Sequence, residues 1–373
     1  MRIHRRTLLK LGAFYSIGSL LNSYANIKSI ATPMKAKPIK IALLGLGNYA
    51  ENWIAPAIDQ SENAELTSIV TGSPHKIAKW QKRYQIKDSN IYNYENLEAI
   101  RDNKEIDCVY IVTPTGTHAD FTIRSFEAKK HVICEKPMAP TVADCDRMIE
   151  AAKSAHKTLQ IGYRLYWDPF NLRLMEAMQK SEFGEIIEMQ GGFSYNHGQW
   201  AREGDWRMNP KLNPGGALFD IGVYVVQSSF YSNPQMHPLS VTAKHSTDRH
   251  QIFKAIPEHW NWELAWPNKL ISQHSSSYGK QENFLRVTTD KGLLEIEPAY
   301  SYENLKGSTP NGPMNLNPVF QQKLQIEGQC LAILNRSNNI TTGEMGRRDI
   351  YLLNRIMEAA ENQSEVRLDN LYF

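Results

Sequence analysis

One feature constrains the fold more than any other: a short apolar strand runs directly into a glycine turn, in residues 39–50 (IKIALLGLGNYA). Four more apolar runs follow it at intervals, ELTSIVT, IDCVYIVTP, HVICEKP and TLQIGY, and stretches with helical periodicity separate them. Such alternation is typical of βαβ units, in which helices join parallel strands. We therefore predict an α/β Rossmann domain with a parallel sheet over residues 39–163.

The pattern changes after residue 163. Longer alternating strands appear, interrupted by one helix: 185–195, 216–231, 283–289 and 293–297. Runs of strands of this kind predict an α+β domain with a large, mostly antiparallel sheet, here over residues 164–373. Two amphipathic segments close the chain: 319–335 and 344–362. The stretch 302–318 is rich in Asn, Pro and Gly, which is typical of a surface loop.

The first 25 residues have the pattern of an export signal. A basic start precedes an apolar run from Leu8 to Leu21, and a small-x-small site follows at Ser23 to Ala25. The segment from Arg5 to Lys10 (RRTLLK) resembles the twin-arginine signal. We expect a signal peptide over residues 1–25, export by the twin-arginine machinery to the periplasm, and no stable membrane association. The alternatives are an uncleaved anchor or a basic tail, and residues 26–38 would form an arm.

The bulk charge excludes one class of partner. The formal net charge of +3 includes four basic residues within the first 25; removing them from the 42 Lys and Arg leaves 38 against 39 acidic residues. A nearly neutral body offers no electrostatic basis for binding nucleic acid. The four cysteines form no CxxC pair and no His/Cys cluster at zinc spacing, so we predict neither a metal site nor a disulfide.

The glycine turn fits the dinucleotide fingerprint G-x-G-x-x-G/A. Gly45 makes the tight turn, Gly47 lets the backbone approach a pyrophosphate, and Ala50 permits close packing of the helix. The expected cofactor contacts in this turn are Gly45, Leu46, Gly47, Asn48 and Tyr49. The alternative is an ordinary tight turn between a strand and a helix.

The end of the second strand favours NADP over NAD. An Asp or Glu normally stands there to bind the adenosine ribose, whereas this chain has Thr71, Gly72 and Ser73. Without a carboxylate, Ser73 can donate to a 2′-phosphate, and Lys76 can supply positive charge. The alternative is that Lys76 is a solvated helix residue.

Two further strand ends lie at the same edge of the predicted sheet. The turn VTPTGTH brings Thr113, Pro114 and His118 towards the cofactor, although His118 would equally suit a helix start where its ring bonds the backbone. The segment HVICEKP places Glu135 and Lys136 immediately beyond a buried strand. A lysine there can hydrogen-bond a substrate oxygen, or it can form a salt bridge with Glu135 or another acid.

A helical segment adds a second pair of reactive groups. In GGALFDIGVY, Asp220 and Tyr224 are four residues apart and therefore share a helix face. A phenol held by the aspartate and opposed by Lys136 would suit removal of a proton while hydride leaves a carbinol carbon. The alternative is a surface pair on an amphipathic helix.

These motifs together carry a family resemblance. The segments GLGNYA, VTPTGTH, VICEKPMAPT, IGYR, DWRMN and GGALFDIGVY, in that order, are similar to the glucose-fructose oxidoreductase/inositol dehydrogenase family, Gfo/Idh/MocA. The resemblance runs from about residue 39 to the C-terminal helix. The glucose-fructose oxidoreductase branch is the most similar, because its members share the GLGxYA turn, the WRMN piece and a tyrosine after DIG.

The resemblance implies roles for individual residues. Lys136 would polarise the reacting oxygen, Tyr224 would donate and accept the proton, and Asp220 would position substrate and tyrosine. Four more residues would lie near the cofactor or sugar: Arg164, Trp206, Arg207 and Tyr302. The large sheet of the second domain would form the interface of a homodimer or homotetramer.

The implied reaction is hydride transfer from C1 of an aldose to NADP, which yields a lactone. Return of the hydride to a ketose would complete a ping-pong cycle. One alternative is a dehydrogenase of the same family acting on another sugar, an inositol, a dihydrodiol or a glycoside. Another is a non-catalytic, NADP-binding sensor.

Overall fold

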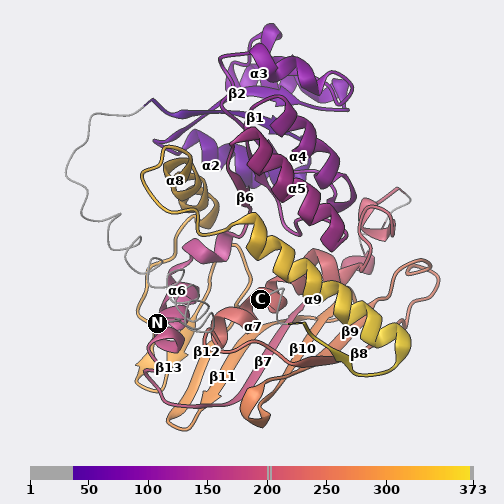
Figure 1. Cartoon of the computed structure of the whole chain (residues 1–373), viewed down its shortest axis with the longest axis vertical. Helices are drawn as coiled ribbons and strands as arrows, with labels where there is room; N and C mark the ends of the chain where they lie inside the picture. The colour runs from indigo at the N-terminus through magenta and orange to yellow at the C-terminus, as the bar shows by residue number, and fades with distance from the viewer. Residues whose placement is uncertain (1–36, 200, 202–203, 370–373) are drawn as a thin grey trace, which may run out of the picture.

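The computed structural model describes residues 37–199, 201 and 204–369. The predicted signal peptide and residues 26–36 of the predicted arm lie outside the described residues. Figure 1 shows a helix-covered sheet above and a second, larger sheet below, with helices between them. The predicted combination of a parallel Rossmann sheet and a mostly antiparallel second sheet is confirmed.

The first sheet is parallel throughout and has the order β3-β2-β1-β4-β5-β6. Its strands are β1 (Ile39–Leu44), β2 (Ala64–Val70), β3 (Ile91–Tyr92), β4 (Cys108–Ile111), β5 (His131–Cys134) and β6 (Leu159–Ile161). The strand order reverses between β1 and β4. In open parallel sheets ligands bind beyond the carboxyl ends of the strands at such a switch point. The glycine turn after β1 lies at this position.

Helices cover both faces of this sheet. One face carries α4 (His118–Glu127) and α5 (Val142–Ala155), and the other carries α2 (Ala55–Asp59), α3 (Ile77–Tyr84) and α8 (Gln321–Ile333). Alternate residues of β1 serve the two faces, because successive strand side chains point in opposite directions. Ala42 and Leu44 belong to one buried cluster, and Ile41 and Leu43 belong to the other.

Helix α8 shows that the chain returns to the first domain. Its sequence position lies within the predicted second domain, yet Ile326 and Cys330 are fully buried in the same cluster as Ile41 of β1. The helix is therefore part of the Rossmann layer by packing (Figure 1). The position of α8 in the sequence does not predict this packing, because it depends on contacts with residues far away in the chain.

The second sheet has the order β14-β13-β12-β11-β7-β10-β9-β8-β15. Its strands are β7 (Ile186–Ser194), β8 (Ser240–Ser246), β9 (His259–Ala265), β10 (Ile271–Ser277), β11 (Glu282–Thr289), β12 (Gly292–Ile296), β13 (Gly307–Thr309), β14 (Gly312–Pro313) and β15 (Val366–Arg367). The β7–β10 pair is parallel, and the other pairs described are antiparallel. The predicted surface loop over residues 302–318 is corrected in part, since it contains the hairpin β13–β14.

Three helices complete the second domain: α6 (Pro169–Gln179), α7 (Val223–Ser232) and α9 (Gly343–Asn362). Figure 1 shows α7 and α9 between the large sheet and the Rossmann domain. Every residue of α7 is buried, including the polar residues Gln227, Ser228 and Ser229. This central helix carries Tyr224 into the space between the two domains.

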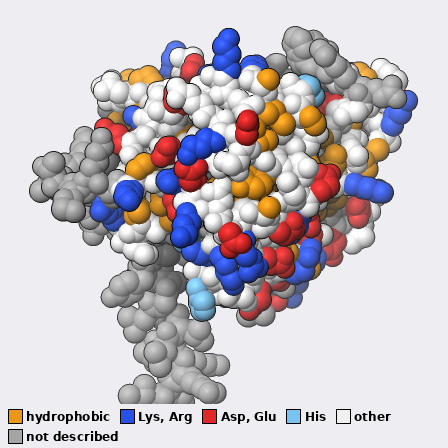
Figure 2. Space-filling view, turned by 90° about the horizontal axis from the view of Figure 1, so that it is seen from above, with side chains coloured by type: hydrophobic (Ala, Val, Ile, Leu, Met, Phe, Trp, Pro, Cys, Tyr) orange, Lys and Arg blue, Asp and Glu red, His pale blue; other side chains and the backbone are white. Residues whose placement is uncertain are grey.

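The surface carries both signs of charge. Figure 2 shows acidic and basic side chains interspersed on the face seen from above. All four cysteines are buried and unpaired. Within the described ranges, no helix is both long and apolar enough to cross a membrane.

Candidate active site

The glycine turn has the backbone that the fingerprint requires. Gly45 has φ +95°, and a Cβ placed there would lie 2.5 Å from the carbonyl oxygen of Val112, so only glycine fits. At Gly47 an added Cβ would meet nothing within 4 Å, and the residue is exposed. Leu46 packs inwards, whereas Asn48 is exposed at the start of the following helix. The turn therefore offers open backbone to a pyrophosphate, as a bound dinucleotide requires.

The end of β2 suits a 2′-phosphate. Thr71 is buried, and its Oγ1 accepts a hydrogen bond from the Ser73 backbone N at 3.0 Å, which shapes the turn. Gly72 is exposed and lies over the ring of Tyr94. The ammonium of Lys76 donates to the Leu46 carbonyl oxygen at 2.7 Å. The predicted cation is therefore held against the glycine turn, and residues 71–76 contain no carboxylate.

Of the two predicted roles of His118, the structure supports the helix start at which the ring bonds the backbone, and not the cofactor contact. Its side chain is 1% exposed, with Nε2 2.8 Å from the carbonyl oxygen of Thr113 and Nδ1 2.9 Å from that of Pro137. Both ring nitrogens are therefore occupied by backbone and cannot contact a cofactor. His118 instead ties the turn after β4, which contains Thr113 and Pro114, to the loop that carries Lys136.

Glu135 is turned into the core behind the active site. Its Oε1 accepts from the Tyr110 hydroxyl at 2.8 Å, and Oε2 accepts from the Lys136 backbone N at 3.2 Å. Burial raises the pKa of Glu135 to about 7. The side chain is only 5% exposed, so its predicted contact with a cofactor is not supported by this geometry.

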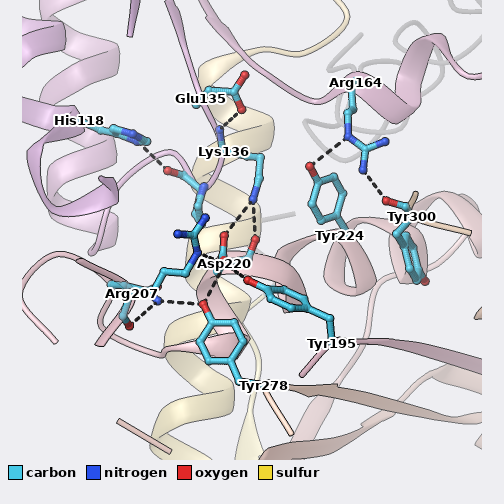
Figure 3. A network of polar contacts seen from close by, with 12 residues as sticks. His118, Glu135, Lys136, Arg164, Tyr195, Arg207, Asp220, Tyr224, Tyr278 and Tyr300 are labelled. Atoms are coloured by element: carbon cyan, nitrogen blue, oxygen red, sulfur yellow. Dashed lines mark hydrogen bonds and ion pairs between the residues drawn. The ribbon is translucent and has the colours of Figure 1, made fainter. Parts of the chain in front are cut away.

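The ammonium of Lys136 connects the two domains (Figure 3). It donates to the Asp220 carbonyl oxygen at 2.5 Å, and it lies 3.6 Å from Asp220 Oδ1. It also lies 4.8 Å from the centre of the Tyr224 ring. The lysine follows β5 of the Rossmann sheet, whereas its partners belong to the π-helix η9 (Leu218–Gly222) and to α7. The three residues predicted to be catalytic are therefore together.

The carboxylate of Asp220 is surrounded by donors. Its Oδ2 accepts from the Tyr278 hydroxyl at 2.8 Å, from Arg207 Nε at 3.1 Å and from the Tyr195 hydroxyl at 3.2 Å. Burial by itself would raise the pKa of Asp220, but the Arg207 guanidinium and the Lys136 ammonium hold it well below its ordinary value. The group is therefore a fixed negative charge beside Lys136.

Tyr224 is held by an arginine rather than by the aspartate. Its hydroxyl accepts from Arg164 Nε at 3.2 Å, and its ring packs edge-on against Phe193. The predicted pairing of Asp220 with Tyr224 is corrected, because the aspartate bonds Tyr195, Tyr278 and Arg207 instead. Helical spacing places the two residues on one face, but it cannot predict hydrogen-bond donors that belong to other secondary-structure elements.

Four more residues were expected near the cofactor or sugar. Arg164 is 1% exposed and donates to the carbonyl oxygens of Tyr300 and Ser301, so it acts through Tyr224 rather than on a ligand. The ring of Tyr302 lies 5.7 Å from that of Tyr49 in the glycine turn. Arg207 is partly exposed and stacks on the ring of Trp206 at 4.5 Å. Tyr302 therefore lies beside the predicted cofactor turn, and Arg207 lies against Asp220.

Sequence reasoning missed two tyrosines that bind Asp220. Tyr195 follows β7 and Tyr278 follows β10, and these strands are parallel neighbours in the second sheet. Their carboxyl ends therefore meet at one edge, beside η9. Tyr195 ends the predicted strand 185–195, but no local motif marks it as a site residue. Tyr278 was missed because strand β10 was not recognised in the sequence.

Comparison with known proteins identifies similar chains. Residues 39–163 match the family described as "Oxidoreductase family, NAD-binding Rossmann fold", and residues 171–295 match "GFO/IDH/MocA C-terminal domain". D-xylose 1-dehydrogenase [NADP(+)] of Haloarcula marismortui is 25% identical over 339 residues, covering 89% of this chain and 94% of that protein. The aldose-aldose oxidoreductase structure from Caulobacter crescentus has 32% identity and a TM-score of 0.84, covering 89% of this chain and all of that one.

A more distant structure shares the fold alone. The inositol dehydrogenase homolog of Azotobacter vinelandii has a TM-score of 0.77 at 16% identity. The alignment covers 91% of this chain and 100% of that chain. The two-domain architecture is therefore retained where little sequence identity remains.

Proposed function

The chain belongs to the GFO/IDH/MocA family of oxidoreductases, and from that premise we propose that it is an NADP-dependent sugar oxidoreductase that transfers hydride between C1 of an aldose and NADP. The observation that carries the proposal is the meeting of Lys136 with Asp220 and the Tyr224 ring, at the carboxyl edge of the Rossmann sheet. The product would be a lactone. Two relatives, named D-xylose 1-dehydrogenase [NADP(+)] and aldose-aldose oxidoreductase, support an aldose as substrate.

Lys136, Asp220 and Tyr224 have separate roles in the oxidation of a hydroxyl group. Oxidised NADP, when bound, would supply the acceptor for the hydride that leaves the carbinol carbon. Lys136 donates a hydrogen bond to the reacting oxygen, and the ionised Asp220 holds the ammonium in place. Tyr224 exchanges a proton with that oxygen. Because Arg164 donates to the phenol oxygen, the hydroxyl hydrogen of Tyr224 is left to point elsewhere, towards a substrate.

The nucleotide site fits NADP. Gly45 and Gly47 would receive the pyrophosphate, and Ser73 and Lys76 would receive the 2′-phosphate.

Replacing Lys76 with alanine should therefore weaken NADP binding by about tenfold and NAD binding little, because one charge-assisted contact is lost. Lys79→Ala is a matched control, since Lys79 pairs with Glu51. Titration of both nucleotides measures the effect, and an equal loss for NADP and NAD would reject this role of Lys76.

A second half-reaction is the finer part of the proposal. The name aldose-aldose oxidoreductase describes a relative that acts on two sugars, which supports a cycle in which a second sugar takes the hydride back. Such a cycle needs no free nucleotide and suits export to the periplasm with the cofactor already bound. The twin-arginine-like segment RRTLLK supports that route.

Native mass spectrometry of protein purified without added nucleotide tests both parts. Bound NADP(H) that is reduced by an aldose and reoxidised by a second sugar is the expected result. Protein that arrives empty but reduces added NADP with an aldose would retain the dehydrogenase and remove the closed cycle. Nucleotide binding without turnover across a panel of aldoses, ketoses, inositols, dihydrodiols and glycosides would favour a sensor instead.

A further inference from the structure

A pocket lined by lysines and apolar residues lies at the opposite edge of the Rossmann sheet from Lys136. It has a volume of about 620 Å³ and surrounds the amino ends of β1, β4 and β5. Six lysines line it: Lys37, Lys40, Lys104, Lys129, Lys130 and Lys157. We call it the amino-edge lysine pocket. The active site lies beyond the carboxyl ends of the same strands, so the two sites are separated by the length of the sheet.

Among the described residues, no ion pair neutralises the lysines of this pocket. Its one carboxylate is Asp107, whose Oδ2 accepts from the Lys40 backbone N at 2.9 Å. The ammonium of Lys130 donates to the Asn103 carbonyl oxygen. Across the described part of the chain, the lysines that form ion pairs lie elsewhere: Lys79, Lys87, Lys136, Lys180 and Lys323.

Helix ends explain part of this cluster but not all of it. Helices α4, α5 and α8 end near the pocket, and each helix C-terminus carries about half a negative charge. Three helix ends and Asp107 would offset roughly two and a half of six positive charges. The carboxylate of Asp102, which also acts on Lys130, reduces the excess further. Glu105, which acts on Lys40, reduces it again. At least one positive charge remains, so the pocket keeps a field that attracts anions.

The pocket also has a neutral donor and an apolar floor. The Thr158 backbone N donates to His131 Nδ1 at 3.1 Å, which leaves the ring proton on Nε2. Burial lowers the pKa of His131 to about 4, so the ring stays neutral near pH 7. Ile106 and Leu334 lie among the apolar residues that line the rest of the cavity.

We propose that the amino-edge lysine pocket binds a phosphate-bearing anion. Six lysines that line one cavity match the multiple charges and acceptor oxygens of phosphate, for which lysine acts as a point-charge partner. The source is either a free polyphosphate or the headgroup of an anionic phospholipid. The proposal does not depend on the reaction at Lys136.

Calorimetric titration of the NADP-saturated protein with pyrophosphate tests the proposal, because the bound nucleotide blocks phosphate binding at the glycine turn. The test variant is the triple change Lys104→Gln, Lys129→Gln and Lys157→Gln. The control is Lys244→Gln, Lys291→Gln and Lys306→Gln, three exposed lysines on the second domain that alter the net charge equally. We expect one site per chain, weakened about tenfold or more in the test variant and unchanged in the control.

Two further measurements distinguish free polyphosphate from a phospholipid headgroup as the bound anion. Binding to phosphatidylglycerol vesicles without pyrophosphate binding, lost only in the test variant, would assign the headgroup. No binding of either probe at about 0.15 M salt, or equal weakening in both triple variants, would overturn the proposal. If the triple variant does not fold, Lys129→Gln alone is compared with Lys244→Gln by the same titration.

Discussion

At the scale of single residues, the active site depends on one ammonium that reaches across two domains. Lys136 lies 3.6 Å from a carboxylate whose pKa is held well below its ordinary value, and 4.8 Å from the centre of the Tyr224 ring. The ionised carboxylate of Asp220 attracts this ammonium and holds it in one position. The lysine is thereby positioned before any substrate arrives.

Loss of either reacting group should reduce turnover strongly. We expect Lys136→Met and Tyr224→Phe each to lower kcat by about a hundredfold or more, the scale of a missing acid-base group. Steady-state kinetics with an aldose and NADP measures the effect, and circular dichroism checks that each variant is folded. Lys269→Met is a control at an exposed lysine of the second domain. Turnover close to that of the control would remove the residue from the mechanism.

Glu135 should make folding stability depend on pH. Burial raises its pKa from an ordinary 4.5 to about 7, so the folded chain binds more protons than the unfolded chain between these values. The stabilising contribution is complete below about pH 4.5 and is lost as the pH rises through about 7. In Glu135→Gln the free energy of unfolding, measured by denaturant titration, should lose this step. An unchanged pH profile in the variant would contradict it.

At the scale of secondary-structure elements, two strands of the second sheet hold the carboxylate of Asp220. Strands β7 and β10 run parallel, so the residues that follow them, Tyr195 and Tyr278, reach Asp220 from the same edge. Tyr278 is fully buried, and Asn213 Nδ2 also donates to its hydroxyl. The sheet thus determines the orientation of Asp220, although the residue belongs to η9.

Removing the Tyr278 hydroxyl should destabilise this arrangement. Tyr278→Phe leaves Asp220 Oδ2 without its shortest hydrogen bond, and we expect a loss of about 1–3 kcal/mol in the free energy of unfolding. The matched control is Tyr84→Phe in α3 of the Rossmann domain, because the Tyr84 hydroxyl forms no hydrogen bond with the described residues. Denaturant titration of both variants compares the losses. A loss in Tyr278→Phe no larger than in the control would show that the bond contributes little.

At the scale of the whole molecule, neither domain contains the site alone. The glycine turn and Lys136 belong to the Rossmann sheet, whereas Asp220 and Tyr224 come from the second domain (Figure 3). Tyr302 extends this contact to Tyr49 beside the glycine turn. The relative placement of the two domains is therefore part of the active site.

The second domain also presents apolar side chains to solvent. Ile187 is 60% exposed and Ile271 is 46% exposed, on neighbouring strands β7 and β10. We expect the double variant Ile187→Gln and Ile271→Gln to weaken a homodimer or homotetramer, because apolar contact area is lost. Sedimentation velocity over a range of protein concentrations measures this. A monomeric wild type, or a variant that matches Lys244→Gln, would exclude this surface as the interface.

The sequence by itself determined the Rossmann architecture and the three residues that meet at the site. Alternating strands and helices can be recognised from the local periodicity of apolar residues. Motifs that follow parallel strands lie at the same edge of the sheet. Lys136, Asp220 and Tyr224 were therefore identified by position. The family resemblance supported their roles, although those roles await the kinetics described above.

Only the tertiary structure decided the partners of these residues. Local spacing suggested that Asp220 holds Tyr224, yet Arg164 occupies that place, and two unmarked tyrosines surround the aspartate. For His118 the sequence left open a cofactor contact or a ring bonded to the backbone, and the structure has the second, with the ring between two backbone carbonyl oxygens. The hydrogen bonds of Arg164 with Tyr224 and of Tyr278 with Asp220 join residues 60 and 58 positions apart, and contacts between such distant residues leave no local pattern. They depend on how the two sheets pack, and packing is a property of the whole chain.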